Sequence, residues 1–237
     1  MKNLKILNVF GITPATNGIS AGMDFFVPKF NGMEKSDKVL EAFAKSYDLD
    51  KSYMENIIDR LILEVSAVFG SEYAENNELN LLQLFLCLDS PMFDNNTLSD
   101  ENVGIFVEEY LCFTKDKTPG IYMQLDDHIK INSGIKVALD HNCCGVFFNK
   151  SGRGTKGFDV RACVIDEDYS GYVHMSLAYT KDNDFDGKLY CGDKLVQLLI
   201  LPVEHTEAKE ITEDEYNKLM DKSERGDKGF GSSDVKH

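Results

Sequence analysis

The chain has 237 residues, 43% of them hydrophobic, which is enough for a sizeable core, and a formal net charge of −15. An acidic surface repels nucleic acid, so we expect no nucleic-acid partner. No apolar run reaches the roughly 18 residues of a membrane span and no signal peptide is recognisable, so we expect a cytoplasmic protein with no membrane partner.

The first motif along the chain is AGMDFFVP (21–28), in which Asp24 stands between small residues and an apolar run. Helical periodicity begins about ten residues later. Apolar residues recur every three or four positions in SDKVLEAFAKSY, YMENIIDRLILEVSAVFG and SDENVGIFVEEYLCF, which predicts amphipathic helices, and ELNLLQLFLCL is expected to be another. Ser99 or Asp100 can cap the last of them.

This helical part is also the acidic part of the chain. Residues 31–120 hold 18 Asp and Glu against 7 Lys and Arg, a net charge of −11. A small anionic substrate needs local positive charge or a metal. The nearly neutral remainder of the chain can supply that charge and the helical part cannot.

After Pro119 the pattern changes to short alternating segments separated by Gly, Asp or Asn, which is typical of strands. These segments are IYMQLDDHIKI, GIKVAL, CGVFFNK, FDVRACVID, YVHMSLAYT and KLVQLLILPV. Many short strands without helices between them indicate a β-sandwich or barrel. We therefore predict a mainly β fold that uses both ends of the chain and is interrupted by an α-helical insertion.

Four further stretches could carry chemistry. SGRGTKG (151–157) matches a dinucleotide-binding pattern, but a strand follows it, so it is either a turn or an anion-binding loop with Lys150 and Ser151. VIDEDYSG (164–171) is either an acidic turn or a site where an Asp orients water or a metal. In CGDKLVQL (191–198), Gln197 is a polar residue in an apolar strand and needs a partner. RGDKGFGSSD (225–234) is either a frayed terminus or a ligand-gripping arm.

In order along the chain, AGMDFFVP, NKSG, VIDEDYSG, GDKLVQL and RGDKGFGSS resemble the five motifs of the homotrimeric dUTPase family, the deoxyuridine 5′-triphosphate nucleotidohydrolases. The resemblance is nearly continuous from Ile129 to the end and also covers about Ile6 to Lys29. It implies a jelly-roll-like β fold, a homotrimer with active sites shared among three chains, Mg²⁺ as cofactor, and hydrolysis of dUTP to dUMP and pyrophosphate.

The resemblance also assigns residues. Asp166 would be the catalytic residue that orients the attacking water, Tyr169 would pack under the deoxyribose, and Asp24 would support the metal through water. The other substrate-binding positions that it implies are Lys150, Ser151, Gly152, Cys163, Ile165, Gln197, Arg225, Phe230, Gly231, Ser232 and Ser233. The last five belong to an arm that closes over the nucleotide.

Two features depart from the family pattern. Lys150 stands where the second motif usually has an arginine, which loses the bidentate fork, and Arg153 could compensate. Arg161 and Cys163 stand where many relatives have glycines, in a hairpin that recognises uracil largely through its backbone. The bulk of these two side chains could alter how the base fits.

We expect a discontinuous β domain (1–30 and 123–222), an acidic helical insertion (31–122) and a flexible C-terminal arm (223–237). Ordinary family members lack the insertion, which would suit a viral or phage protein. We expect an accessory module that could bind a protein partner; the alternative is that its apolar stripes cover the β body or the trimer contact. The alternative function is a same-fold nucleotide-binding regulator, or a diphosphatase or deaminase acting on another deoxypyrimidine triphosphate.

Overall fold

The computed structural model describes residues 4–16, 18–31, 37–89, 99–181 and 187–221. The chain forms two compact units, 1–203 and 204–237. The strands are β1 (Lys5–Asn8), β2 (Met23–Phe26), β3 (Leu88–Asp89), β4 (Leu111–Phe113), β5 (Pro119–Tyr122), β6 (His128–Asn132), β7 (Ile135–Ala138), β8 (Cys143–Asn149), β9 (Phe158–Ala162), β10 (Val164–Ile165), β11 (His174–Tyr179), β12 (Lys188–Tyr190) and β13 (Lys194–Pro202). The helices are α1 (Asp37–Tyr47), α2 (Lys51–Val68), α3 (Ser71–Ala74), α4 (Glu78–Cys87), α5 (Asp100–Ile105), the π-helical turn η1 (Phe106–Tyr110), α6 (Ser151–Gly154) and α7 (Glu213–Met220).

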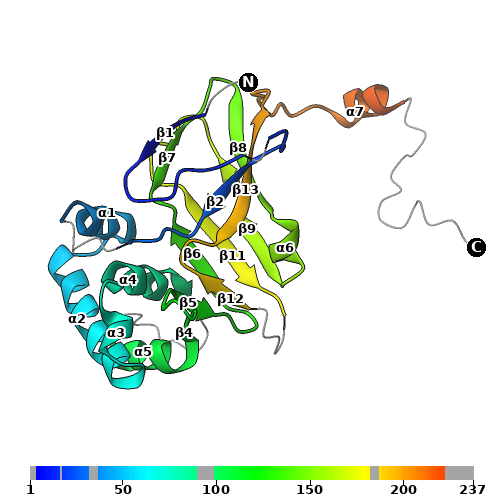
Figure 1. The fold of residues 1–237 in the computed structure, drawn as a ribbon. Helices are drawn as coiled ribbons and strands as arrows, with labels where there is room; N and C mark the ends of the chain where they lie inside the picture. The colour runs from blue at the N-terminus through cyan, green and yellow to red at the C-terminus, as the bar shows by residue number, and fades with distance from the viewer. Residues whose placement is uncertain (1–3, 17, 32–36, 90–98, 182–186, 222–237) are drawn as a thin grey trace, which may run out of the picture. The chain divides into compact units, whose positions relative to one another are not determined.

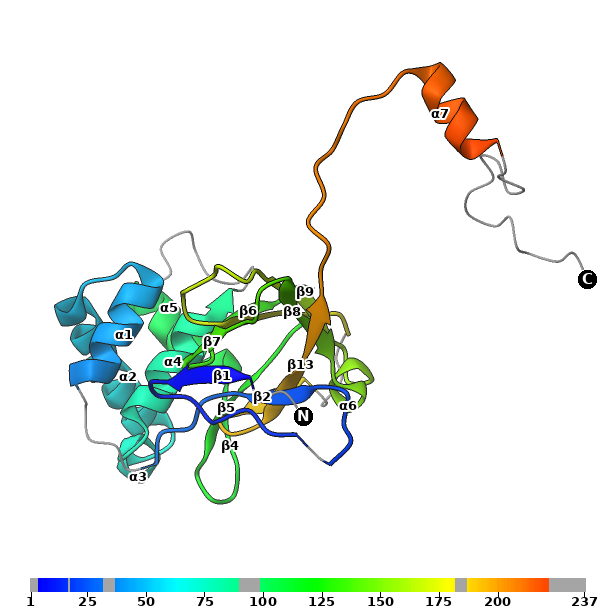
Figure 2. The same cartoon turned by 90° about the horizontal axis from the view of Figure 1, so that it is seen from above.

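The strands of the first unit form antiparallel sheets, and helices α1 to α5 gather beside them (Figures 1 and 2). Two sheets have four strands each, in the orders β10-β8-β13-β2 and β3-β6-β11-β9. The smaller sheets are β12-β5-β4 and β1-β7. This arrangement confirms the predicted mainly β fold with an interrupting helical segment.

The four predicted helices are present as α1, α2, α4 and α5 with η1. Ser99 caps α5, as predicted, because its hydroxyl accepts a hydrogen bond from the Asn102 amide (3.1 Å). The last helix ends at Tyr110, earlier than the periodicity suggests, because the next three residues form β4 and pair with β5. The segment IYMQLDDHIKI also divides into β5 and β6, at a turn where Asp126 has a φ of 68°.

The helical segment is built into the β body. Between residues 37 and 110 it contributes β3, which extends the sheet at β6, and α4, which packs against β5 and β6. The next strand, β4, lies within the predicted insertion and joins β5. One continuous hydrophobic core contains residues of both parts, such as Leu81 and Phe85 of α4 and Met175 of β11. The helices therefore share the core of the β body.

Two buried amides fasten α4 to the chain just after β2. Asn80, which is 1% exposed, accepts a hydrogen bond from the Phe30 amide (2.9 Å) and donates one to the Phe30 carbonyl (3.0 Å). Gln83 donates to the carbonyl of Pro28 (3.2 Å). Backbone groups that would otherwise lie unpaired in the core are satisfied by the insertion.

An aromatic cluster joins α1 to the same region. The ring of Phe43 on α1 lies 4.9 Å from that of Phe10 and 6.0 Å from that of Phe30, measured between centroids. Tyr172, just before β11, contacts Phe10 at 5.7 Å. These contacts agree with the alternative in which the apolar stripes of the helices cover the β body, rather than with a self-contained accessory module.

The second unit contains α7, which the sequence analysis did not predict. Thr212 and Glu215 form a capping box: the Glu215 amide donates to the Thr212 hydroxyl (3.3 Å) and the Thr212 amide donates to the Glu215 carboxylate (2.9 Å). The T-x-x-E spacing was the available signal. Among the described residues, no helix has the length and apolar character that crossing a bilayer requires.

Replacing Asn80 with leucine should lower the free energy of unfolding by roughly 3 kcal/mol, because two buried backbone groups of Phe30 lose their partners. Urea denaturation of the two proteins measures this difference. Glu75→Gln, at an exposed position before α4, is the control and should change little. A loss below about 0.5 kcal/mol in Asn80→Leu would contradict the role of Asn80 in fastening the helices.

Candidate active site

The first group of candidate residues lies around Asp24 on β2. β2 pairs with β13, where Gln197 stands directly opposite Asp24 and Lys194 stands opposite Phe26. The register shifts by one residue between Lys194 and Val196, which is a β-bulge. Side chains three residues apart normally point to opposite faces of a strand, but the bulge brings Lys194 and Gln197 to the same face as Asp24.

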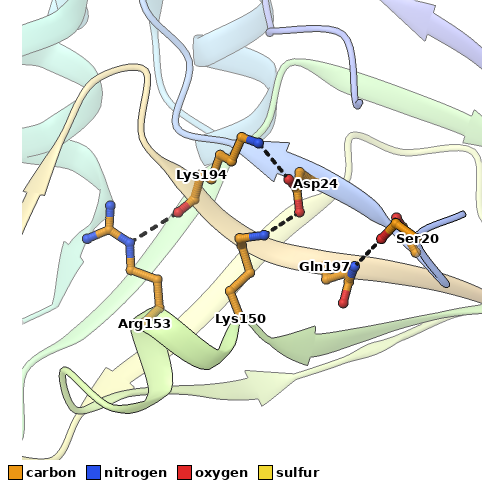
Figure 3. Close-up of polar contacts among 7 residues, drawn as sticks. Ser20, Asp24, Lys150, Arg153, Lys194 and Gln197 are labelled. Carbon is orange, nitrogen blue, oxygen red and sulfur yellow. Dashed lines mark hydrogen bonds and ion pairs between the residues drawn. The ribbon is translucent and has the colours of Figure 1, made fainter. Parts of the chain in front are cut away.

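Two lysines hold the Asp24 carboxylate, one at each oxygen (Figure 3). Lys150, at the end of β8, places its Nζ 2.5 Å from Oδ1. Lys194, at the start of β13, places its Nζ 2.9 Å from Oδ2. Asp24 is only 4% exposed, whereas the lysines reach toward solvent, so the cluster presents two ammonium groups over a buried carboxylate.

The charge state of Asp24 follows from these contacts. Burial by itself raises the pKa of the carboxyl, but the two lysine ammonium groups outweigh burial and hold the pKa of Asp24 below its usual value of 3.8. Asp24 is therefore ionised at neutral pH. One carboxylate cannot neutralise two ammonium groups, so the cluster keeps a net positive charge that suits an anionic ligand.

Arg153 could compensate for the missing motif-two arginine, but in this structure its side chain contacts other groups than Asp24. Its guanidinium donates to the carbonyls of Lys194 and Lys188, both at 3.1 Å, and pairs with Asp193 at 2.6 Å. Its side chain is 15% exposed and lies over the Phe158 ring. Arg153 thus ties α6 to the turn before β13. Lys194, which the sequence analysis did not select, supplies the second cation beside Lys150.

The remaining motif-two and motif-four residues surround this cluster. Ser151 and Gly152 lie exposed in α6, a single helical turn directly after Lys150. Strand β9 follows α6, so the glycine-rich loop does not open a dinucleotide-binding helix. Gln197 is half-buried and donates to the Ser20 hydroxyl (3.1 Å), the partner that its place in an apolar strand required (Figure 3).

A second group of candidate residues lines a pocket of about 420 Å³. Cys163, Ile165, Asp166 and Tyr169 all contribute to its wall. Asp166 is exposed at the pocket, directly after β10, and Ile165 is buried beneath it. A cavity of this size falls within the usual range for small-molecule sites.

Two side chains of this region limit the shape of the pocket. The Tyr169 ring is 43% exposed, and its hydroxyl donates to the Tyr172 carbonyl (2.7 Å), which fixes the ring across the turn. Cys163 lies in the pocket wall, so its side chain does occupy space near the candidate base site. Arg161 is exposed and pairs with Asp159 (3.7 Å). It does not line the pocket, so its side chain does not narrow it.

The two groups occupy opposite edges of one sheet. In the order β10-β8-β13-β2, Asp166 follows the strand at one edge and Asp24 lies on the strand at the other. Adjacent strands lie about 4.8 Å apart, so three spacings separate these edges by roughly 14 Å. One chain therefore does not bring its own Asp24 and Asp166 to the same phosphate.

The donors around Asp24 permit one mode of metal binding. Within the described ranges there is no cluster of three or more His, Cys, Asp or Glu side chains that could enclose a metal ion. Mg²⁺ often uses one or two carboxylates, several waters and the phosphates of its substrate. A single carboxylate such as Asp24 fits that mode. Arg225, Phe230, Gly231, Ser232 and Ser233 lie outside the described residues.

The sequence of this chain is similar to those of known proteins. A family model described as dUTPase matches residues 118–234. The deoxyuridine 5′-triphosphate nucleotidohydrolase of variola virus is 31% identical over 106 residues, which cover 45% of this chain and 67% of the viral protein. The chain belongs to the dUTPase family. The corresponding enzyme of vaccinia virus (strain Copenhagen) is 30% identical to this dUTPase-family chain over the same share of each protein.

The fold of this dUTPase-family chain also resembles solved structures over nearly its whole length. A point mutant of the Staphylococcus bacteriophage 80alpha dUTPase with dUpNHpp matches 99% of this chain and 100% of its own, with a TM-score of 0.52 and 15% identity. A different point mutant of the 80alpha phage dUTPase gives a TM-score of 0.51, also at 15% identity, over 98% of each chain. At this identity the likeness shows the fold alone.

Replacing Asp24 with asparagine should lower the free energy of unfolding by roughly 2 kcal/mol at neutral pH, because an amide cannot accept from both lysines. Because the pKa of Asp24 is lowered in the folded state, its ion pairs stabilise the fold fully above about pH 4. This stabilisation is lost as the pH falls through the folded-state pKa, which lies below 3.8.

Urea denaturation of wild type and Asp24→Asn between pH 2.5 and 7 tests this expectation, with exposed Asp116→Asn as the control. The difference between wild type and Asp24→Asn should shrink toward zero at the acid end of the series. A difference that stays constant with pH would show that the ion pairs do not stabilise the fold.

Proposed function

We propose that this chain hydrolyses dUTP to dUMP and pyrophosphate. The observation that carries the proposal is the Asp24–Lys150–Lys194 cluster, a cationic site on a buried carboxylate, within the same chain as a nucleoside-sized pocket that presents Asp166 and Tyr169. Family membership and the relatives named for this reaction support the choice of substrate.

The cationic cluster would bind the triphosphate. Lys150 and Lys194 can exchange the Asp24 carboxylate for phosphate oxygens, since both ammonium groups lie partly in solvent. Ser151 and the exposed amide of Gly152 add hydrogen-bond donors beside Lys150, and Gln197 adds an amide on the same face. Phosphoryl transfer depends on positioning and charge neutralisation more than on covalent help, and this set of groups would contribute to both.

Mg²⁺, when bound with the triphosphate, would neutralise part of its negative charge. Asp24 would hold the hydrated ion through water, and the phosphate oxygens would supply the remaining contacts. The two lysines would then be released from Asp24 to the substrate.

Asp166 would orient the water that attacks the α-phosphorus. The new bond joins the water oxygen to the α-phosphorus, the bond to the bridging oxygen of the β-phosphate breaks, and pyrophosphate leaves. An exposed carboxylate at a pocket wall can accept a hydrogen bond from this water and from the 3′-hydroxyl of the sugar. Tyr169, fixed by its hydrogen bond to Tyr172, would pack under the deoxyribose, where a 2′-hydroxyl would clash.

A complete site would draw its residues from more than one copy of the chain. The separation of Asp24 and Asp166 by three strand spacings supports this proposal, because a nucleotide on one chain's cationic cluster needs a catalytic carboxylate from another copy. A homotrimer with shared active sites satisfies this need. The helices of the insertion pack on the β body, and no described contact favours a protein partner there, so we propose none.

An assay with dUTP, dCTP, dTTP and UTP in the presence of Mg²⁺ tests the proposed function. We expect pyrophosphate and dUMP from dUTP, with at least about a hundredfold preference over the other three nucleotides. Conversion of dCTP to dUTP without pyrophosphate would identify a deaminase. Nucleotide binding without any product would identify a regulator.

Replacing Asp166 with asparagine should reduce kcat by at least about a thousandfold with little change in nucleotide affinity, because an amide does not polarise the water as a carboxylate does. Pyrophosphate release and calorimetric binding of the non-hydrolysable imido analogue separate the two effects. Asp168→Asn, on the same turn, is the matched control and should keep wild-type turnover. Near-normal turnover in Asp166→Asn would remove Asp166 from the catalytic role.

Ending the chain at Asp221 should lower dUTP turnover by roughly a hundredfold, because the substrate would lose the contacts that we assign to Arg225, Phe230, Gly231, Ser232 and Ser233. The thermal unfolding midpoint should stay unchanged. A chain of full length that carries Lys236→Ala serves as the control. If the shortened chain hydrolyses dUTP at the wild-type rate, residues 222–237 take no part in the reaction.

A further inference from the structure

The pocket that contains Asp166 has a polar wall that none of the five motifs supplies. His174, the first residue of β11, lines this pocket together with Lys130 of β6 and Ser46 of α1. His174 pairs with Asn132 across the β11–β6 ladder, and Ser176 pairs with Lys130, so these side chains share one face of the sheet. The insertion, through Ser46, forms part of the same wall.

The contacts of His174 determine which ring nitrogen carries the proton. Nδ1 lies 2.9 Å from the carbonyl oxygen of Tyr172. A carbonyl only accepts, so Nδ1 must donate, and in the neutral ring Nε2 then holds a lone pair. Burial, with a further contribution from the nearby charge of Lys130, lowers the pKa of His174 below 6.5, which keeps the ring neutral at neutral pH.

This lone pair is unused. Nε2 of His174 is buried and has no hydrogen-bond partner within the described part of the chain. Most buried polar atoms in native proteins have a partner, so an acceptor left unpaired at a pocket wall points to a donor supplied by a ligand. His174 lies in the pocket with Cys163 and Asp166, where the nucleoside would bind.

One aromatic neighbour holds the ring in place from the side of the insertion. The Tyr47 ring of α1 meets the His174 ring edge-on, at 6.5 Å between centroids. The Tyr47 hydroxyl donates to the carbonyl of Lys130 (3.3 Å), which fixes α1 to the strand beside the pocket.

We propose that His174 is a specificity-determining residue whose Nε2 accepts a hydrogen bond from the imide N–H of uracil. This inference rests on the proposed function, since it assumes that the pocket takes the base of dUTP. Uracil presents a donor at N3, which a lone pair on Nε2 would pair with. Cytosine presents a lone pair at N3, which would face the lone pair of Nε2 and leave both groups without a donor.

The test compares wild type with His174→Phe, which keeps a ring of similar shape and removes both nitrogens. Calorimetry measures the Kd of the imido analogues of dUTP and dCTP, and steady-state assays measure KM and kcat for dUTP. We expect the Kd and KM for the uracil nucleotide to rise at least about tenfold with kcat nearly unchanged. The preference for uracil over cytosine should fall by a similar factor.

Two variants separate base recognition from a structural role. His174→Gln offers a carbonyl oxygen near the position of Nε2, so it should keep part of the preference for uracil. This variant remains informative if His174→Phe does not fold. His128→Phe, an exposed histidine of β6, is the matched control and should bind both analogues as wild type does. An unchanged uracil-to-cytosine ratio in folded His174→Phe, or in His174→Gln if the phenylalanine variant does not fold, would overturn the inference.

The outcomes also distinguish this inference from the proposed function. If wild type hydrolyses dUTP but the ratio does not depend on His174, only the inference fails. If wild type releases no pyrophosphate from dUTP, the proposed function fails, and the Kd ratios of the two analogues still decide whether His174 reads the base.

Discussion

The buried carboxylate of Asp24 is the interaction on which the proposed phosphate site depends. It gathers one lysine from the end of β8 and one from the start of β13, and its low pKa keeps it charged at neutral pH. Without a ligand, the carboxylate prevents two neighbouring ammonium groups from repelling each other. If a triphosphate binds as we propose, the same two ammonium groups would pair with its phosphate oxygens, so a contact that stabilises the protein without ligand would also prepare the binding site.

The helical segment changes how the nucleoside side of the site is built. Its helices share the core of the β body through Asn80, Gln83 and Phe43, and α1 reaches the pocket wall through Ser46. The pocket therefore combines residues of strands from both four-stranded sheets with one helix. Such a site can use side chains to read a base where relatives of this family are expected to use the backbone of a hairpin.

The sequence predicted most of the strands and the four main helices, because each depends on a local pattern, but it did not predict β3, β4 or β12. It did not predict Lys194, since residues 194 and 197 share a face only through a β-bulge, and bulges have no simple sequence signal. The contacts of Arg153 could not be predicted, because its carbonyl partners, Lys188 and Lys194, are distant in sequence. The position of His174 depends equally on the packing of α1, β6 and β11 in three dimensions.

The placement of β2 has a consequence for the order of folding. Among the described strands β2 pairs only with β13, near the other end of the β body, so during synthesis it leaves the ribosome long before its partner exists. Contacts this distant in sequence form slowly. The helices depend on nearer contacts, and α4 binds the backbone of Pro28 and Phe30 directly after β2. We expect the nascent helices to keep this apolar segment out of solvent until β13 is synthesised. Chains without the insertion must protect β2 in another way.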